Sequence, residues 1–309
     1  MDVRCLRVLI VLADRGTLRA VADATGYSTS AVSQQLAALQ REVGDVLVEP
    51  AGRRLALTPA GRVLLPHARS VLATLDTARG QLDPQGPPVG EVRLAGYATA
   101  LVQHVVPAVV RLRADHPGLV VGLQEREPDE VAELLAQDAV DVGLVYEYSL
   151  VPPSLSGVPF GRGVPFGRVP MALAVPAGER RDLAGLLADP GTGWITNSRG
   201  PDDDELVARV GARFGARPRI THRIDSLDLL VRLVAAGLGV ALIAADGPHL
   251  DGVRHLDLDG VAGTRCGYAL TRPGREQWRA NAVLIQAITT LHDSVDPSHP
   301  GVFRTALPM

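Results

Sequence analysis

The chain has 309 residues, of which 46% are hydrophobic and 21% are charged, and its formal net charge is −3. A single domain usually contains about 100 to 200 residues, so we expect two or three folded units with substantial cores. This composition excludes a largely disordered chain. The two cysteines, Cys5 and Cys266, have no metal-ligand spacing, which excludes a disulfide framework and predicts two buried thiols.

Near the N-terminus, Arg4, Arg7, Asp14 and Arg15 bracket an apolar run that is too short to span a membrane. We therefore expect a cytoplasmic protein without a membrane partner. The charges are unevenly distributed: residues 1–82 carry 10 arginines against 7 acidic residues, whereas residues 83–309 carry 21 against 27. Because basic patches carry nucleic-acid affinity, this asymmetry indicates DNA binding by the N-terminal part.

Helical patterns follow one another at the start of the chain. Apolar residues recur at helical spacing from Cys5 to Ala13, and Gly16 ends that helix. Thr17 is the expected N-cap of a second helix over residues 18–24. A turn at Gly26 then precedes a third helix, so the region predicts a tri-helical unit.

The third helix is capped by Ser28 or Thr29 and reaches about Val43. Its apolar stripe is predicted to pack on the core and comprises Val32, Leu36, Leu39 and Val43. The opposite face is small, polar and not acidic, as a recognition helix in the major groove requires. Hydroxyls bond phosphates or base edges and glutamine can bond adenine, so the expected DNA contacts are Ser28, Thr29, Ser30, Ser33 and Gln34, with Thr29, Ser33 and Gln34 as the specificity candidates.

Residues 46–57 read VLVEPAGRRLAL, two β-prone runs around AGRR. They predict a hairpin wing with Arg53 and Arg54 at or beside its tip, where both can reach phosphates. The alternative is a merely solvated helix face with arginines that serve solubility. The wing favours the DNA-binding interpretation, and we expect residues 1–58 to form a winged helix-turn-helix domain.

A long helix is predicted over residues 59–82, because Thr58 followed by Pro59 is a helix start signal. Its apolar residues alternate spacings of four and three, like a coiled-coil seam, and the expected dimerisation residues are Leu64, Ala68, Val71, Leu75 and Ala78. The alternative is a helix that lies on its own domain. Residues 83–90, DPQGPPVG, cannot continue the helix and predict a hinge.

Strands alternate with helices after the hinge, which predicts an α/β fold with parallel sheets in two lobes. We expect an effector-binding domain over 91–293, with lobe I at 91–166 and 267–293, lobe II at 167–266 and a loose tail at 294–309. The peptide VPFGR occurs twice, at 158–162 and 164–168, where either a hinge strand or a loop insertion is expected.

The N-terminal part resembles LysR-type transcriptional regulators through two segments, LADRGTLRAVADATGYSTSAVSQQLAALQREVG and GRRLALTPAGRVLL. The similarity extends to about residue 292 and includes LVAAGLGVALI at 233–243. Family members commonly have an aromatic residue where Leu18 and Val48 stand and an arginine where Pro50 stands. They also often have Gln and Arg where Thr29 and Gln34 stand. These differences concern the operator sequence rather than DNA binding.

The resemblance implies two αβ lobes, similar to periplasmic binding proteins, with a small-molecule effector in the cleft. Ligands of such sheets bind beyond the carboxyl ends of the strands, next to helix N-termini. Thr99 matches the family's usual polar effector contact and is also expected to cap a helix. Arg199 is expected to neutralise a ligand carboxylate. The full set of expected effector contacts is Ala98, Thr99, Tyr146, Asn197, Ser198, Arg199 and Ser226. Plain helix capping is the alternative role for these polar residues.

Two other classes of protein remain alternatives, a metabolic enzyme and a solute-binding protein built on the same lobes. No nucleophile elbow, phosphate loop, metal motif or dinucleotide fingerprint appears in the sequence. A solute-binding protein would leave residues 1–82 without a purpose. We therefore predict a non-enzymatic regulator without a cofactor or metal. It would bind double-stranded DNA at a pseudo-palindromic operator, as a homodimer or tetramer, together with a small-molecule effector and with RNA polymerase as a further candidate partner.

Overall fold

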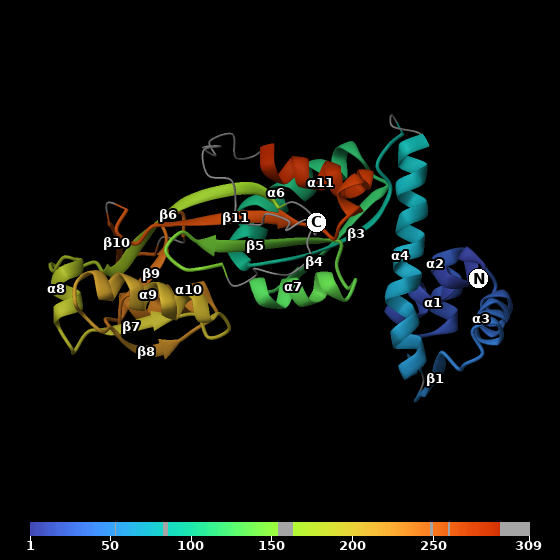
Figure 1. Ribbon diagram of the computed structural model, residues 1–309, viewed down its shortest axis with the longest axis horizontal. Helices are drawn as coiled ribbons and strands as arrows, with labels where there is room; N and C mark the ends of the chain where they lie inside the picture. The colour runs from blue at the N-terminus through green and yellow to red at the C-terminus, as the bar shows by residue number, and fades with distance from the viewer. Residues whose placement is uncertain (53, 83–85, 154–162, 248–249, 259, 291–309) are drawn as a thin grey trace, which may run out of the picture. The chain divides into compact units, whose positions relative to one another are not determined.

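The computed structural model describes residues 1–52, 54–82, 86–153, 163–247, 250–258 and 260–290. The chain divides into two compact units, one built on residues 1–87 and the other on most of the chain from residue 88 onward (Figure 1). Each unit is described by itself. Arg53, the first VPFGR copy and the tail expected at 294–309 lie outside the described residues.

The N-terminal unit contains the expected three helices, a hairpin and a long helix. They are α1 (Val3–Arg15), α2 (Leu18–Thr25), α3 (Thr29–Val43), β1 (Val48–Ala51), β2 (Arg54–Leu57) and α4 (Pro59–Leu82). The strands β1 and β2 pair antiparallel and form the wing. The fold of this unit is therefore a winged helix-turn-helix followed by a long helix.

The helix starts of this unit are satisfied by the side chains that the sequence indicates. The hydroxyl of Thr17 accepts a hydrogen bond from the backbone N–H of Ala20 at 3.2 Å, and that of Ser28 accepts one from Ala31 at 3.1 Å. Ser28, rather than Thr29, is thus the cap of α3. The Thr58 hydroxyl accepts from the N–H of Gly61 at 3.1 Å and begins α4. These caps supply acceptors for backbone donors that a helix leaves without partners.

The core of the N-terminal unit contains the predicted stripe of α3 except for its last member. Val32, Leu36 and Leu39 are buried, whereas Val43 is exposed because it lies in the last turn, beyond the core. The side chain of Gln40 fixes the wing, since its Oε1 atom accepts a hydrogen bond from the N–H of Leu47 at 2.8 Å. The polar face of α3 is consequently held in a fixed direction relative to the wing.

The stripe on α4 is divided between two environments, which corrects the expectation of one continuous dimerisation seam. Ala68 is buried in the core of its own unit and Leu64 packs against that core. An ion pair of 2.9 Å between Arg69 and Asp14 also fastens α4 to α1. Two apolar side chains farther along, Val71 and Leu75, are exposed by 44% and 36%. The first part of the stripe therefore serves the domain itself, and only the later part is available to a partner.

The C-terminal unit has two lobes joined by the long strand β6 (Val164–Pro176), which pairs with β11 over residues 164–170 and with β9 and β10 over residues 171–176. Lobe I comprises β3 (Gly90–Gly96), α5 (Ala98–Ala100), a π-helical turn (Leu101–Val105), α6 (Val106–Asp115), β4 (Leu119–Glu125), α7 (Pro128–Ala136), β5 (Val142–Tyr148), β11 (Thr264–Leu270), a short helical turn (Arg275–Gln277) and α11 (Arg279–Thr290). Lobe II comprises α8 (Leu183–Ala188), β7 (Gly193–Thr196), α9 (Pro201–Arg213), β8 (Arg219–Arg223), α10 (Leu227–Ala235), β9 (Ala241–Ala244) and β10 (Val253–Asp257).

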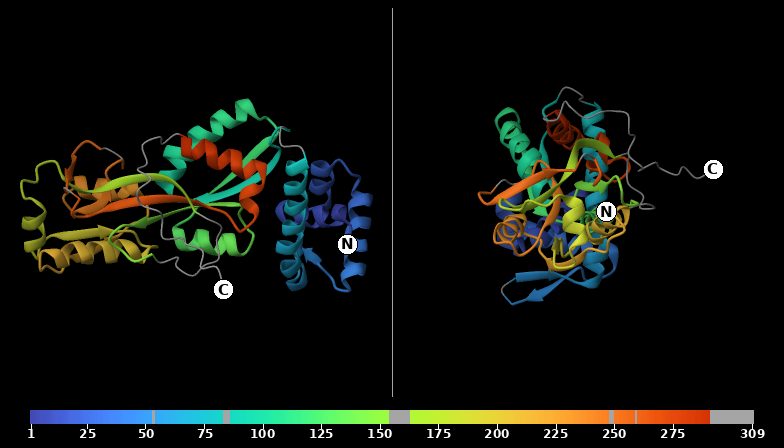
Figure 2. Two further views of the ribbon diagram at one scale, coloured as in Figure 1. Left: turned by 45° about the horizontal axis from the view of Figure 1, so that its top comes forward. Right: turned by 90° about the vertical axis from the view of Figure 1, so that its left-hand side faces the viewer.

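The sheets are mixed, which corrects the expectation of parallel sheets. The strands β3, β4 and β5 pair in parallel, as do β7 and β8, but β6, β9, β10 and β11 pair antiparallel with their neighbours. Chain crossings between the lobes explain this, because β6 runs from lobe I into lobe II and β11 returns from lobe II into lobe I, antiparallel to both β5 and β6. Figures 1 and 2 show α6 and α11 on one face of the sheet of lobe I and α7 on the other.

The strand β10 was not expected from the sequence. The expected boundary between the lobes lies after residue 166, whereas β6 changes its pairing partners from those of lobe I to those of lobe II between residues 170 and 171. On the return path, β11 begins at residue 264, ahead of the expected boundary after residue 266. The second VPFGR copy forms the start of β6, the strand that runs from one lobe to the other.

Candidate functional site

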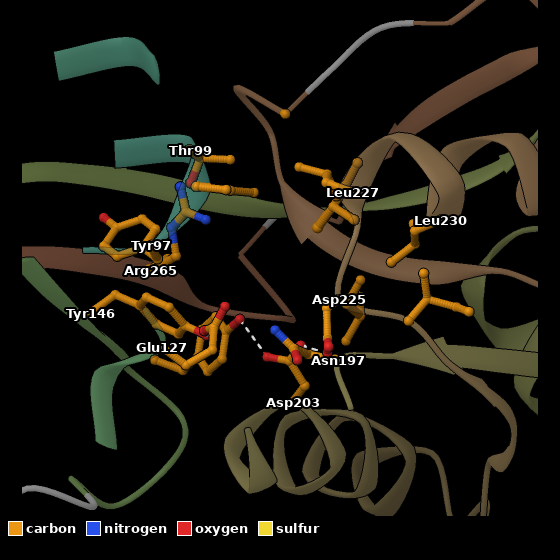
Figure 3. A pocket seen from close by; sticks show the side chains of 17 residues that line it. Tyr97, Thr99, Glu127, Tyr146, Asn197, Asp203, Asp225, Leu227, Leu230 and Arg265 are labelled. Carbon is orange, nitrogen blue, oxygen red and sulfur yellow. Dashed lines mark hydrogen bonds between the residues drawn. The ribbon is translucent and has the colours of Figure 1, made fainter. Parts of the chain in front are cut away.

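The C-terminal unit encloses a pocket of about 90 Å³ between its two lobes. Lobe I contributes the ends of β3, β5 and β11, whereas lobe II contributes the start of α9 and residues around α10 and β9 (Figure 3). Its polar side chains are Tyr97, Thr99, Glu127, Tyr146, Tyr148, Asn197, Asp203, Asp225 and Arg265. Four of the expected effector contacts line this pocket, namely Ala98, Thr99, Tyr146 and Asn197.

Arg265 supplies the positive charge of the pocket. Its side chain is 13% exposed and its guanidinium carbon lies 5.1 Å from the ring centre of Tyr97 and 5.7 Å from that of Tyr146. The single ion pair of this arginine among the described residues is with Asp246 at 3.6 Å, and no described residue accepts a hydrogen bond from it. Burial raises the pKa of Tyr97 to about 12, so this ring stays a neutral face for the cation.

Glu127 and Asp203 supply buried negative charge from opposite lobes. Glu127 accepts a hydrogen bond from the hydroxyl of Tyr146 at 3.1 Å, and Asp203 accepts one from Tyr148 at 2.6 Å. Burial raises the pKa of both carboxyl groups, because the charged form loses its hydration and the tyrosine hydroxyls compensate only in part. The two carboxylates therefore favour a cation between the lobes.

Thr99 lines the pocket with an unused polar atom. Its hydroxyl oxygen is buried and has no hydrogen-bond partner among the described residues. The expected capping role is wrong, because Tyr97 occupies the cap position before α5 and Thr99 lies inside the first turn. A buried hydroxyl without a partner costs about 1 to 3 kcal/mol, and a ligand that bonds it would remove this cost.

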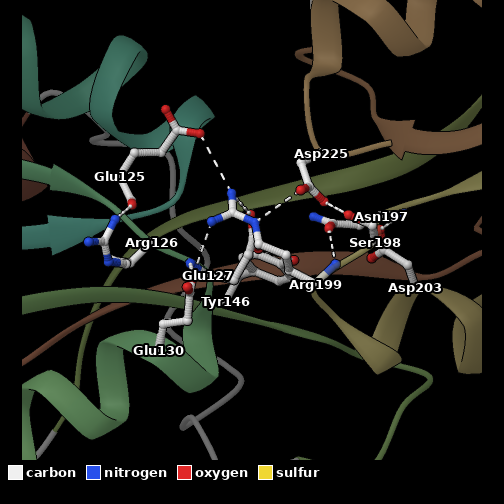
Figure 4. Close-up of polar contacts among 10 residues, drawn as sticks. All are labelled: Glu125, Arg126, Glu127, Glu130, Tyr146, Asn197, Ser198, Arg199, Asp203 and Asp225. Carbon is white, nitrogen blue, oxygen red and sulfur yellow. Dashed lines mark hydrogen bonds and ion pairs between the residues drawn. The ribbon is translucent and has the colours of Figure 1, made fainter. Parts of the chain in front are cut away.

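Arg199 forms a network of ion pairs between the lobes instead of facing the pocket (Figure 4). Its guanidinium lies 3.2 Å from Glu130 and 3.8 Å from both Glu125 and Glu127 in lobe I, and 3.3 Å from Asp225 in lobe II. The expectation that Arg199 neutralises a ligand carboxylate is therefore not supported, because four carboxylates of the protein already surround it. We call this group the Arg199 clasp.

Two further expected contacts make hydrogen bonds within lobe II. Ser226 caps α10 by accepting a hydrogen bond from the N–H of Leu229 at 3.3 Å, and it does not line the pocket. Ser198 donates its hydroxyl to Asp225 and also lies outside the pocket lining. Helix capping, the alternative role, is thus correct for Ser226, whereas Ser198 neither lines the pocket nor caps a helix. The pKa of Asp225 is lowered by the hydrogen bonds from Ser198, which keeps this carboxylate charged beside the clasp.

The expected DNA contacts of α3 lie on one exposed surface of the N-terminal unit, and they are Ser28, Thr29, Ser30, Ser33 and Gln34. Arg54 is exposed at the wing, but its guanidinium also donates a hydrogen bond to the carbonyl oxygen of Arg15 at 3.0 Å. Arg54 thus attaches the wing to the end of α1 and has a structural role beside any contact with phosphate. Arg53 lies outside the described residues.

The sequence analysis missed four charged residues that line the pocket, which are Glu127, Asp203, Asp225 and Arg265. Glu127 follows the end of β4 and Asp203 lies in the first turn of α9, so the rule that ligands bind beyond strand carboxyl ends indicates both. That rule does not indicate Arg265, because β11 runs antiparallel to β5 and the amino end of β11 lies at the pocket. There Arg265 is the register partner of Tyr148 in β5. Only the crossing topology of β6 and β11 reveals it.

Two family models match separate parts of the chain: residues 3–62 match the bacterial regulatory helix-turn-helix protein of the lysR family, and residues 85–292 match the LysR substrate binding domain. The chain belongs to the LysR family of transcriptional regulators. As a LysR-type regulator it combines a DNA-binding helix-turn-helix with an effector-binding domain, and its function is ligand-responsive regulation of transcription. The resemblance and the fold class predicted from the sequence are confirmed.

Similar proteins include a Mycobacterium avium protein named "Probable hydrogen peroxide-inducible genes activator", which is 32% identical over 87% of this chain and 84% of its own length. The activator IlvY of Salmonella typhimurium is 27% identical over 79% of this chain and 82% of its own length. Among solved structures, a full-length OxyR variant from Pseudomonas aeruginosa matches with a TM-score of 0.69 and 18% identity over 96% of this chain and 99% of its own. CbnR complexed with its target DNA matches with a TM-score of 0.57 and 22% identity, over 93% and 99% of the two chains.

Two features of the described residues concern membranes and metals. None of their helices is both long and apolar enough to cross a membrane. Within the same residues, no group of three or more histidine, cysteine, aspartate or glutamate side chains could hold a metal ion.

Proposed function

We propose that this LysR-type regulator works as a homodimer or a dimer of dimers that reads a pseudo-palindromic operator with paired α3 helices. The exposed polar surface of α3 supports this, since its N-terminal side chains are free of core contacts and its direction is held by the wing. Ser33 and Gln34 would contact base edges and Ser28, Thr29 and Ser30 would contact phosphates or bases. A cytoplasmic location, the lack of enzymatic activity and a contact with RNA polymerase belong to the same proposal.

The dimer would form through the exposed part of the stripe on α4. Leu64 and Ala68 are used by the core of the unit, so the contacts with a second copy would come from Val71, Leu75 and Ala78. These side chains repeat at the spacings of a coiled-coil seam and have no described partner on their exposed side. A single copy of α3 would read one half-site, so pairing of two copies would set the spacing between half-sites.

The pocket of lobes I and II would hold the effector. The observation that carries this proposal is the combination of Arg265 and the hydroxyl of Thr99, both nearly buried at the pocket and neither hydrogen-bonded to a described residue. An effector that binds the closed lobes more tightly than the open lobes would shift their populations and change how the dimers are arranged on DNA.

A peroxide response, suggested by the name of the Mycobacterium avium relative, is not carried over to this chain. Peroxide sensing by a thiol requires an accessible cysteine with a lowered pKa. Burial raises the pKa of Cys5, and neither Cys5 nor Cys266 lines the pocket. The pocket geometry supports a bound small molecule instead.

A gel-shift titration on the DNA upstream of its own gene tests the DNA-binding proposal. Gln34→Ala should relax the preference for particular bases at one position, whereas Arg54→Ala should weaken binding to all sequences alike and lower the salt dependence. A matched control is Arg232→Ala, an exposed arginine of lobe II that pairs with Asp228. Equal losses for Gln34→Ala on operator and scrambled DNA would contradict base reading by α3.

A further inference from the structure

The charges around the pocket are arranged with opposite signs on opposite sides. Figure 3 shows Arg265 next to Thr99 on one side and Glu127, Asp203 and Asp225 gathered on the other. Asp225 is already neutralised by the Arg199 clasp through an ion pair of 3.3 Å. Glu127 shares Arg199 with three other carboxylates, and Arg265 pairs with Asp246 at 3.6 Å without a hydrogen bond to a described residue. The ligand would therefore meet one arginine with unused donors and two buried carboxylates, Glu127 and Asp203, that lack a full counter-charge.

We propose that the effector is a small zwitterion, an α-amino acid with a short aliphatic side chain. Its carboxylate would pair with Arg265 and accept the hydroxyl of Thr99. Its ammonium group would bind between Glu127 and Asp203, which stand on opposite lobes. This inference rests on the proposed function, in which the pocket holds the effector.

The partners of each charged group explain why both charges of the ligand are needed. Arg265 has five N–H donors, and none of them donates a hydrogen bond to a described residue, so a carboxylate would satisfy an otherwise underused guanidinium. The acceptor capacity of Asp203 is likewise only partly used, by the hydroxyl of Tyr148 and by the N–H of Asn197 at 3.2 Å. Glu127 accepts from the hydroxyl of Tyr146 and from the side chain of Asn197, and it shares Arg199 with other carboxylates. A carboxylate accepts more hydrogen bonds than these, and an ammonium group donates three.

Ligands with a single charge fit the same pocket less well. A simple acid would pair with Arg265 but would leave Asp203 without a cation and Glu127 with only its share of Arg199. A simple amine would satisfy the carboxylates and leave Arg265 with Asp246 at 3.6 Å as its one anion among the described residues. Each mismatch leaves a charge desolvated and unpaired between closed lobes, which is costly. A ligand with two negative charges would suffer most, because the carboxylates outnumber the arginine.

The size and the apolar lining indicate the rest of the molecule. The pocket volume of about 90 Å³ indicates a compact ligand. Lobe II lines its share of the pocket with aliphatic side chains, among them Leu227, Leu230 and Leu242. Figure 3 shows Leu227 and Leu230 across the pocket from Arg265. A short aliphatic side chain on the amino acid would pack there.

Isothermal titration calorimetry on the full-length protein tests the inference with three matched series. Each series holds one side chain constant: L-alanine with propionate and ethylamine, L-valine with isovalerate and isobutylamine, and L-leucine with isocaproate and isoamylamine. We expect at least one amino acid to bind about tenfold or more tightly than its own acid and amine, since each lost pair costs one charge-assisted hydrogen bond. An acid or an amine that binds as tightly as its amino acid, or the failure of all three amino acids to bind, would overturn the inference.

Variants separate the roles of the two sides. Glu127→Gln should weaken the amino acid about tenfold and strengthen the matched acid, because it removes a negative charge that repels carboxylates. Thr99→Val should weaken the amino acid and the acid but leave the amine unchanged, because it removes the hydroxyl that would donate to the ligand carboxylate. A merely structural role would weaken all ligands alike. Arg232→Gln, an exposed arginine of the same unit, is the control that should change nothing.

The same preparation is assayed for binding to its upstream DNA. If it binds that DNA selectively but binds no amino acid, the ligand class is wrong and the regulator is not. If it binds no DNA selectively, the proposed operator recognition fails irrespective of the calorimetry.

Discussion

Replacing Arg199 with glutamine should open the two lobes of the effector-binding domain. Arg199 is the centre of the clasp and lies within 3.8 Å of three glutamates of lobe I. The substitution removes the positive charge and leaves those glutamates facing Asp225 across the cleft. The unliganded protein should therefore spend less time with its lobes closed.

The magnitude follows from the exposure of the side chains. Arg199 is 32% exposed, and its partners Glu125 and Glu130 are exposed by 58% and 41%, so solvent screens these pairs. Partly exposed pairs contribute about 0.2 to 1 kcal/mol each, and the three interlobe pairs together contribute about 1 to 2 kcal/mol after screening. This corresponds to a factor of about 5 to 30 in the closed population, and the apparent effector affinity should fall by at most that factor.

Hydrogen–deuterium exchange of the full-length protein measures the opening without a ligand. Arg199→Gln should speed exchange in the segments around Glu127 and around Asn197, which form the two sides of the cleft. Arg209→Gln is the matched control, because Arg209 pairs with Glu205 at 2.6 Å within α9 and joins no lobes. Unchanged exchange in both segments together with a large loss of effector affinity would refute the clasp and would restore Arg199 as a ligand contact.

Three other substitutions test separate parts of the structure. Gly61→Ala should destabilise the N-terminal unit by about 1 to 3 kcal/mol in chemical denaturation, because a Cβ atom there would collide with the carbonyl oxygen of Leu47, and an unchanged midpoint would contradict this packing. Burial raises the pKa of Glu127 above its ordinary 4.5, so the folded state binds this proton more tightly than the unfolded state and the contribution of Glu127 to stability should increase as the pH falls. Thermal denaturation from about pH 4.5 upward should show Glu127→Gln flattening that dependence, and an identical slope in both proteins would count against it. Leu75→Asp should produce monomers in sedimentation, whereas Val63→Asp, a 67% exposed position off the stripe, should leave the mass unchanged. Equal masses for both variants and the wild type would argue against the seam.

Local signals in the sequence were sufficient for the N-terminal unit. Caps such as Thr17 and Ser28 and the period of the α3 stripe act within a few residues, so the elements they predict are present in the structure. The packing of Leu64 and Ala68 on their own domain was not predictable in this way, because a periodic apolar stripe is the same whether it packs on another copy or on its own domain. That choice depends on the packing of α4 on α1.

The effector pocket was predictable only where residues follow the carboxyl ends of parallel strands. Thr99 and Asn197 meet that condition and line the pocket. Arg265 does not meet it, because two lobe crossings bring an antiparallel strand into the sheet, and such long-range connections have no local signature in the sequence. The Arg199 clasp was not predicted for a related reason, since the three glutamates that surround Arg199 come from a distant segment of lobe I.

DNase footprinting of the wild-type protein on the DNA upstream of its own gene tests the central claim most directly, which is that a dimer reads an operator with two α3 helices. The account predicts two protected half-sites whose centres are separated by one helical turn of DNA, about 10 to 10.5 base pairs, or by a multiple of it. Uniform protection along the fragment, or a single isolated half-site at every protein concentration, would contradict it.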